Sequence, residues 1–313
     1  MSLINSMQSV LCILLMISVG YFFSRIGWFN DGTAKLFSKV VVNIAVPGYM
    51  ISNLISTYDR SKLICLAGGV LIPYTSMIIC YVLGTLIAKA IKLPSNRRGI
   101  FAATISISNT LFVGLPVNVA LFGDSSIPFV FIYFIANVSL FWTIGAYGIS
   151  RDGGREGHIF SKENLKKMVS PPLCAFIIAV ILIFVEASLP KFLKDTFKYM
   201  GNMLTPLSML YIGITIYNID FKEMKWDKSM SLIVIGRFVI SPLLVFFLCS
   251  SVVMPVLMKK VFIIQSAMPA MSVTSVLAEA GGGDHKYAAI VTTMTTIATL
   301  LFLPIYIILL SKV

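Results

Sequence analysis

The chain has 313 residues, of which 58% are hydrophobic and only 12% are charged. A water-soluble domain devotes about a quarter of its residues to charged side chains, so this composition excludes a soluble globular enzyme. The formal net charge of +12 does not indicate a nucleic-acid partner, because the basic residues lie in short gaps between apolar runs and set the orientation of membrane helices. The composition predicts an all-helical integral membrane protein whose solvent is the lipid bilayer.

Apolar runs of about 20 residues are long enough to cross a hydrocarbon core of roughly 30 Å. Clusters of glycine, proline and charge divide the chain into ten such spans. In chain order they are residues 7–23, 36–57, 63–90, 99–122, 126–149, 171–187, 197–217, 229–254, 261–280 and 286–311. The polar segment 151–170 separates five spans from five. We therefore expect a first repeat over 1–150, a cytoplasmic linker over 151–170 and a second repeat over 171–313.

The basic residues also predict the orientation. The loops after odd-numbered spans, with the adjacent span ends, hold 16 Lys and Arg, whereas the opposite side holds 8. Cytoplasmic loops carry the excess of Lys and Arg in membrane proteins. Both termini are therefore predicted to lie outside a bacterial plasma membrane that the chain crosses many times.

Short motifs of the first half recur in the second half at a nearly constant offset. Asn43-Ile-Ala-Val-Pro47 recurs as Asn202-Met-Leu-Thr-Pro206, and Leu121-Phe-Gly-Asp124 recurs as Gly281-Gly-Gly-Asp284. A repeat with five spans must enter the membrane from the opposite side the second time. Two inverted repeats are a common plan of secondary transporters, in which the binding site lies near the bilayer midplane.

The fourth and ninth spans combine polar side chains with helix breakers at matching depth, so both are predicted to unwind in the membrane and to cross there. Unwound backbone is tolerated at that depth only where protein buries it or where it lines a cavity. The N-termini of the resulting half-helices favour a carboxylate. The alternative is that these residues only kink helices for close packing. The candidate substrate-binding residues are Asn109, Thr110, Gly114, Pro116, Gln265, Pro269, Ser272 and Thr274.

Arg237 is the only charged residue well inside an apolar span. Nine residues beyond Lys228 places it roughly 13 Å into the membrane, where a charge costs about 2.5–3.5 kcal/mol. One interpretation is a cation in the pathway that helps to hold an anionic substrate. The others are an arginine that snorkels to the interface and one that binds the carbonyl ends of a broken helix. The acidic residues all lie in loops or near span ends, which favours an anion site.

Asn43 and Asn202 each precede a proline by four residues. Their amides either bond carbonyls that the proline releases, or they face the substrate path. No catalytic triad, phosphate loop or cluster of metal ligands occurs in the sequence, so no enzymatic activity, metal or cofactor is expected. The coupling ion, H⁺ or Na⁺, is left open.

Four runs resemble the auxin efflux carrier family in its short bacterial form: residues 41–56, 108–116, 236–244 and 267–284. The resemblance implies a fold shared with bile-acid/sodium symporters. Spans one, two, six and seven would then form a scaffold through which the protein dimerises, and the other six a mobile transport domain.

The resemblance also implies elevator-type alternating access for small organic anions, such as malate, malonate or auxin-like weak acids. It makes Pro116 and Pro269 the crossing prolines and turns the Asn109 amide toward the substrate carboxylate. Family members often have asparagine after the second proline, where this chain has Met271, Ser272 and Val273. The alternatives are a sodium-coupled symporter of larger amphipathic anions and a membrane sensor that binds its ligand without transporting it.

Overall fold

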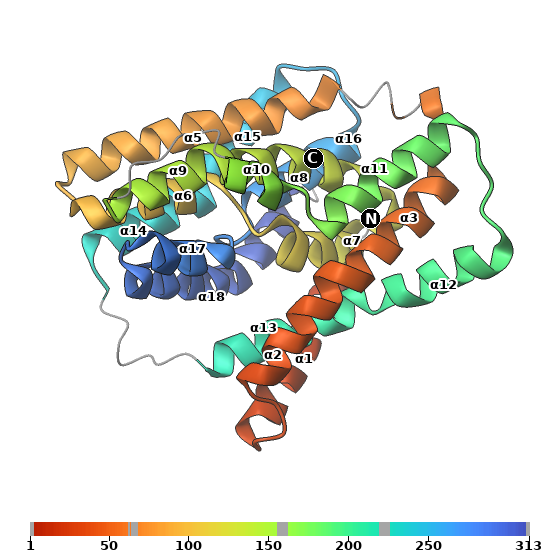
Figure 1. The fold of residues 1–313 in the computed structure, drawn as a ribbon, viewed down its shortest axis with the longest axis horizontal. Helices are drawn as coiled ribbons and strands as arrows, with labels where there is room; N and C mark the ends of the chain where they lie inside the picture. The colour runs from red at the N-terminus through yellow and green to blue at the C-terminus, as the bar shows by residue number, and fades with distance from the viewer. Residues whose placement is uncertain (1–2, 62, 64–67, 155–161, 219–225, 311–313) are drawn as a thin grey trace. The chain divides into compact units, whose positions relative to one another are not determined.

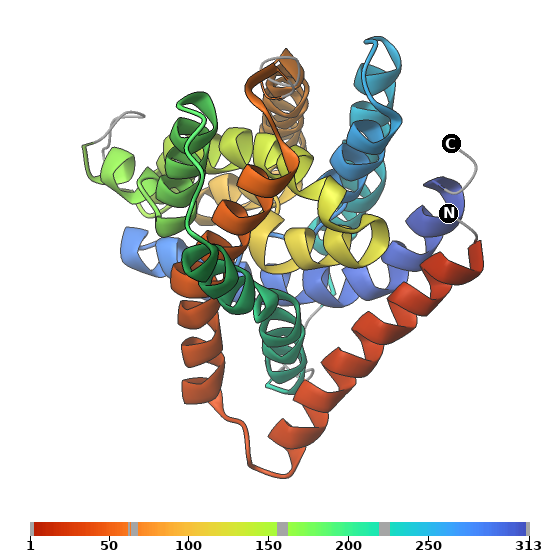
Figure 2. The same cartoon turned by 90° about the vertical axis from the view of Figure 1, so that its right-hand side faces the viewer.

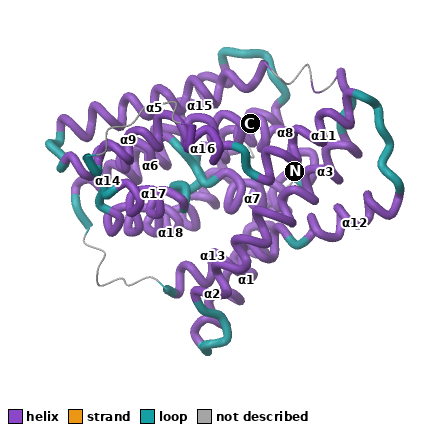
Figure 3. Tube along the Cα trace, in the orientation of Figure 1, coloured by secondary structure: helices purple, strands orange, loops and turns teal. Residues whose placement is uncertain are grey.

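The computed structural model describes residues 3–61, 63, 68–154, 162–218 and 226–310 (Figure 1). Within these ranges the regular elements are helices joined by loops, apart from an isolated bridge between Ser108 and Ala270 (Figure 3). The chain divides into two compact units. Unit 1 contains residues 1–68, 111–132 and 169–219, and unit 2 contains residues 69–110, 133–168 and 220–313. Residues 155–161 of the expected linker lie outside the described residues.

The helices of unit 1, with the first part of α8, are α1 Leu3–Arg25, α2 Asp31–Val40, η1 Val41–Ala45, α3 Val46–Thr57, α7 Leu115–Phe122, η5 Asp124–Ser126, α8 Ile127–Leu140, α11 Pro171–Phe184, α12 Lys191–Asn202 and α13 Leu204–Tyr217. The helices of unit 2, with η2 and η4 at its borders, are η2 Gly68–Val70, α5 Leu71–Ala90, η3 Ser95–Arg97, α6 Arg98–Ser106, η4 Thr110–Gly114, η6 Phe141–Gly145, α9 Ala146–Asp152, α10 Lys162–Met168, α14 Lys228–Ile235, η7 Gly236–Ile240, α15 Ser241–Ser250, α16 Val256–Ser266, α17 Val273–Gly281 and α18 His285–Leu310.

Five of the described helical segments are long and apolar enough to cross a membrane. They are Asp31–Thr57, Gly68–Ala90, Asp124–Asp152, Lys228–Ser250 and His285–Leu310. Shorter apolar helices cover Leu11–Arg25, Thr110–Phe122 and Pro171–Phe184. These segments support a multi-pass membrane protein.

The expected seventh span, 197–217, is not one helix. Its first residues belong to α12, which ends at Asn202, and α13 begins at Leu204. Pro206 has no backbone N–H, and in a continuous helix its ring would clash with the carbonyl of Asn202. The helix therefore ends at that carbonyl and starts again after a one-residue turn.

In the described residues, wide π turns interrupt four of the apolar helices, and prolines account for three of these turns. η1, η4 and η7 are each followed by an α-helix with proline in its first turn: Pro47, Pro116 and Pro242. Proline removes one backbone hydrogen bond and its ring needs space in the preceding turn, which a wider turn provides. η6 has no such proline. π turns of this kind often occur at functional sites.

In unit 1 the backbones of α1 and α13 approach closely along their length (Figure 1). A Cβ atom on Gly20 would lie 2.4 Å from the carbonyl oxygen of Leu210, and one on Gly213 would lie 2.2 Å from that of Ile17. Small residues allow this approach between membrane helices. The loop after α1 leads into the long helix formed by α2, η1 and α3 (Figure 2).

Unit 2 has a buried core to which α5, α6, α9, α14, α17 and α18 contribute. Phe101, Ile105, Phe141, Ile233 and Val291 are almost fully buried there. α6 packs against α5 and α9, and α5 also packs against α15 (Figure 1). This core holds the ends of α6 and the start of α17 in place.

Helices in the two halves of the chain end at matching positions. α3 and α13, α5 and α15, and α6 and α16 form three pairs, and the sequence separation between the last residues is the same in each pair. These last residues are Thr57 and Tyr217, Ala90 and Ser250, and Ser106 and Ser266.

Candidate functional site

The two stretches predicted to be interrupted are interrupted in the structure. α6 ends at Ser106, where Ile107 turns to an extended conformation, and α16 ends at Ser266. Pro269 explains the second ending, because its ring would clash with the carbonyl of Gln265 and it disfavours helical backbone at Met268. At the first ending, Ser108 and Asn109 carry short polar side chains that compete with helical hydrogen bonds.

The two interruptions meet inside unit 2. We call residues 107–110 and 267–272 the helix crossing. Ser108 and Ala270 form an antiparallel bridge, and the N–H of Asn109 donates to the carbonyl of Pro269 over 2.8 Å. Because main-chain groups that leave a helix inside a membrane need new partners, these bonds stabilise the unwound backbone.

Two side chains from neighbouring helices complete the backbone bonding. Asn137 of α8 accepts from the N–H of Ser108 at 2.9 Å and donates to its carbonyl at 2.9 Å. The hydroxyl of Thr295 in α18 accepts from the N–H of Ala270 at 3.1 Å. Asn137, Thr295 and Ser108 are fully buried. Each segment of the helix crossing is therefore held from a third element.

Polar side chains also link the two segments. The amide of Asn109 donates to the hydroxyl of Ser272 at 3.1 Å, and the amide of Gln265 donates to the carbonyl of Thr110 at 3.4 Å. Ser272 directly precedes α17, whose first N–H groups carry the partial positive charge of a helix N-terminus. Amide, hydroxyl and helix N-terminus thus lie together, a set of groups that suits a carboxylate.

Arg237 lies in the π turn η7 and is fully buried. Its Nε donates to the carbonyl of Met268 at 2.6 Å and its Nη1 to the carbonyl of Ile105 at 2.9 Å. The carbonyl of Met268 lies just after the C-terminal end of α16, and the carbonyl of Ile105 lies in the last turn of α6. Of the interpretations that the sequence left open, the geometry matches an arginine bound to the carbonyl ends of broken helices and does not match a snorkelling one.

Two buried polar atoms beside the helix crossing have no hydrogen-bond partner among the described residues. They are Nη2 of Arg237, a donor, and Oε1 of Gln265, an acceptor. Buried polar groups are normally paired, so each of these atoms keeps unused hydrogen-bonding capacity. No described group of three or more His, Cys, Asp or Glu residues could hold a metal ion.

The structure brings six of the candidate residues together at the helix crossing. Thr274 is buried in the first turn of α17, and its N–H donates to the carbonyl of Met271. Gly114 and Pro116 lie in unit 1, at the end of η4 and the start of α7. The six residues are Asn109, Thr110, Gln265, Pro269, Ser272 and Arg237.

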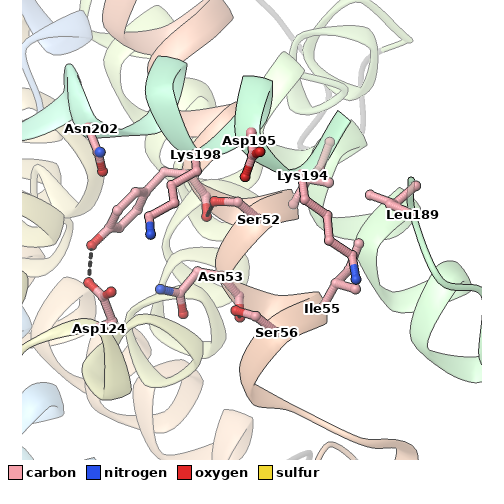
Figure 4. A pocket seen from close by; sticks show the side chains of 12 residues that line it. Ser52, Asn53, Ile55, Ser56, Asp124, Leu189, Lys194, Asp195, Lys198 and Asn202 are labelled. Carbon is pink, nitrogen blue, oxygen red and sulfur yellow. Dashed lines mark hydrogen bonds between the residues drawn. The ribbon is translucent and has the colours of Figure 1, made fainter. Parts of the chain in front are cut away.

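Asn43 and Asn202 are placed in unit 1. Asn43 is exposed and donates to the carbonyl of Lys39 at 2.7 Å, one turn earlier, and not to a carbonyl that Pro47 releases. Asn202 lines a cavity of about 240 Å³ between α3 and α12 (Figure 4). Its charged lining residues are Asp124, Lys194, Asp195 and Lys198, so positive and negative charges balance there.

Sequence reasoning missed Asn137 and Thr295. Asn137 had a usable signal, because it is the only amide in the apolar run from Ile127 to Trp142. Thr295 had none, since it is one of several threonines in α18 and its neighbours in sequence have the same chemistry.

An ion pair holds the loop before α18 in unit 2. Nε of Arg97 lies 2.7 Å from Oδ2 of Asp284, and Oδ1 of Asp284 accepts from the N–H of Tyr287 at 2.9 Å. Burial acts to raise the pKa of Asp284, but the N–H of Tyr287 and the guanidinium of Arg97 outweigh it and hold that pKa below its ordinary value. Asp124, at the corresponding position of the first half, accepts instead from the hydroxyl of Tyr49 in unit 1.

Comparison with known proteins adds independent evidence. A family model described as membrane transport protein matches residues 5–307. An uncharacterized transporter of Methanocaldococcus jannaschii, MJ1031, is 27% identical over 96% of this chain and 97% of its own. One from Methanothermobacter thermautotrophicus is 27% identical over 98% and 99% of the two chains, and the transporter YfdV of Escherichia coli is 23% identical over 72% and 74%.

Proposed function

The chain belongs to the membrane transport protein family, and from the geometry of the helix crossing we propose that it is a secondary active transporter of small organic anions. We expect carboxylates such as malate or malonate, or auxin-like weak acids. The observation that carries the proposal is the bridge between Ser108 and Ala270, beside which an amide, a hydroxyl and a helix N-terminus gather.

The electrostatics of the site favour a negative ligand. Arg237 adds a full positive charge to the partial charge at the N-terminus of α17. Among the described residues no carboxylate forms an ion pair with Arg237, and the titratable groups beside it are the neutral hydroxyl of Tyr133 and the neutral thiol of Cys80. Since charges act strongly over short distances in a low-dielectric interior, a carboxylate is favoured near the helix crossing.

An inverted repeat and an elevator-type mechanism are part of the proposal. The recurring motifs and the matching helix ends support two repeats of five spans with discontinuous fourth and ninth spans. The division into two compact units supports a scaffold and a mobile domain. The grouping of α7 with unit 1 differs from our assignment of the whole fourth span to the mobile domain. We propose a homodimer through the scaffold, in the plasma membrane, with both termini outside.

Counterflow in proteoliposomes tests the proposal. Liposomes preloaded with an unlabelled carboxylate should accumulate the same labelled carboxylate when the purified protein is present, and protein-free liposomes should not. Malonate, malate and indole-3-acetate would be screened, with pH and sodium varied independently. Accumulation of at least one acid above the protein-free value is expected, and its absence for every acid overturns the proposal.

Binding measurements separate the alternatives. A symporter of larger amphipathic anions would accumulate such anions only with sodium present. A sensor would bind a carboxylate, detected by isothermal titration calorimetry, without any flux. Binding of a carboxylate without flux therefore does not count as support for transport.

A further inference from the structure

Arg237 occupies the place at the helix crossing where main-chain carbonyls converge. The carbonyl of Ile105 belongs to the last turn of α6, and that of Met268 follows the end of α16 by two residues. One guanidinium binds both, at 2.9 and 2.6 Å. Gly236 allows this placement, because a Cβ atom there would lie 3.0 Å from the side chain of Ile105.

Carbonyls at the ends of interrupted helices are ligands for a cation. They carry the partial negative charge of the helix C-terminus, and in broken-helix transporters such groups coordinate Na⁺ or H⁺. A guanidinium presents five N–H donors and a permanent positive charge, so it satisfies the same carbonyls without an ion from solution. The full burial of Arg237 keeps water from competing for these bonds.

The charge of Arg237 is not cancelled by an acid within the described residues. Its electrostatic neighbours are the hydroxyl of Tyr133 and the thiol of Cys80, both on helices that pack in unit 2. The chain therefore has a positive charge fixed at the carbonyl ends, where a sodium-coupled protein would have to recruit one.

We infer that Arg237 is a built-in replacement for a coupling cation: its guanidinium fixes both carbonyl ends and makes the formation of the anion site independent of sodium. This inference rests on the proposed function in so far as it concerns transport. It is a positioning role, since Arg237 acts on the ends of α6 and α16 and through them on the segments that hold Asn109 and Ser272.

The experiment measures thermal unfolding of the purified full chain in detergent, at constant ionic strength, with NaCl, KCl, guanidinium chloride or N-methylglucamine chloride at 50 mM. The wild-type midpoint should agree within 1 °C in all four salts. In N-methylglucamine chloride, the unfolding midpoint of Arg237→Met should lie several degrees below that of wild type. In guanidinium chloride, the variant should recover at least half of this difference in midpoint. Arg25→Gln, which removes an exposed arginine at the end of α1, is the matched control and should behave as wild type.

Arg237→Lys keeps the positive charge on a shorter side chain. We expect its unfolding midpoint to lie between those of wild type and Arg237→Met when guanidinium is absent. A wild-type midpoint that rises by several degrees in NaCl relative to the other salts overturns the inference. So does an Arg237→Met protein that guanidinium does not stabilise more than it stabilises wild type. If Arg237→Met does not fold, the salt series on wild type and Arg237→Lys decides.

The transport arm uses the same salts in counterflow. Wild-type counterflow should be unchanged when N-methylglucamine replaces sodium, and a more than threefold loss contradicts the inference. If no carboxylate gives counterflow, the proposed function fails, whereas the unfolding measurements still decide the role of Arg237. The two failures are thus distinguishable.

Discussion

The side-chain amide of Asn109 donates to the hydroxyl of Ser272 across the helix crossing, at 3.1 Å, although the two residues are 163 positions apart in the sequence. The backbone N–H of Asn109 binds Pro269 in the same crossing. Asn109 therefore joins the chain after α6 to the N-terminus of α17, and its amide lies where the ligand carboxylate is proposed to bind.

Replacement of this amide should impair transport. Asn109→Ala is expected to reduce carboxylate counterflow by at least tenfold, because a hydrogen bond to a charged group contributes about 1.5–3 kcal/mol. The protein should still elute as a folded species, since the main-chain bond to Pro269 does not need the side chain. Asn218→Ala, which removes an exposed amide bound to Asp31, should keep wild-type counterflow. Equal counterflow in both variants would remove Asn109 from the site.

Loss of Asn137 should destabilise the protein. Asn137→Ala leaves the buried N–H of Ser108 without its side-chain partner, at a cost of about 1–3 kcal/mol, whereas the carbonyl of Ser108 still accepts from the N–H of Thr110. The expected result is a lower midpoint of thermal unfolding together with lower counterflow. Asn118→Ala is the comparison, because Asn118 is equally buried but its side chain bonds, within the described part of the chain, only the carbonyl of Gly114 one turn earlier. A smaller drop for Asn137→Ala than for Asn118→Ala would contradict the role given to Asn137.

A methyl group on Gly99 should disrupt the core of unit 2. Its Cβ would lie 2.2 Å from the main-chain carbonyl of Gly148, which cannot move without shifting α9. Overpacking of this kind costs about 1–3 kcal/mol, so Gly99→Ala should unfold several degrees below wild type. Gly68→Ala meets no atom within 4 Å and should change the unfolding midpoint little. Similar midpoints for the two variants would show that the contact between α6 and α9 can relax.

The ion pair of Asp284 predicts a pH dependence. Because the folded-state pKa of Asp284 lies below the ordinary value of 3.8, its contribution to stability is present above that value and is lost as the pH falls through the lowered pKa. Asp284→Asn should therefore unfold at a lower temperature than wild type at pH 7, and the difference should shrink below pH 4. Asp195→Asn, in unit 1, serves as control. A difference that is constant from pH 7 to pH 3 would exclude the ion pair as its cause.

The parts of the fold that could be predicted are those governed by local chemistry. Pro269 and the run of polar residues before Pro116 indicated the two interruptions, because proline cannot continue a helix and short polar side chains compete for its hydrogen bonds. The division between α12 and α13 was missed even though Pro206 was visible. A proline near the start of a helix and one inside it look the same in sequence, and only the position of the first turn distinguishes them.

The residues of the site could be predicted where polar side chains accompany a helix breaker, as at Asn109 and Ser272, or where a side chain was unusual, as at Arg237. Arg237 stood out as a lone charge, and its position left three interpretations that differ in which atoms lie nearby. The sequence gives no distance between Arg237 and Ile105, which are 132 positions apart. In the structure, Nη1 of Arg237 lies 2.9 Å from the carbonyl oxygen of Ile105. Thr295 shows the same limit, because the tertiary fold selects it from several equivalent threonines.

The bridge between Ser108 and Ala270 consists of main-chain atoms, which every amino acid except proline supplies in full. Under the proposed function, substitutions among the side chains around it can therefore change which acid is recognised, while the main-chain bridge that positions them stays intact. In related proteins with this function, a few replacements near Asn109 and Ser272 can therefore change the substrate while the fold is kept.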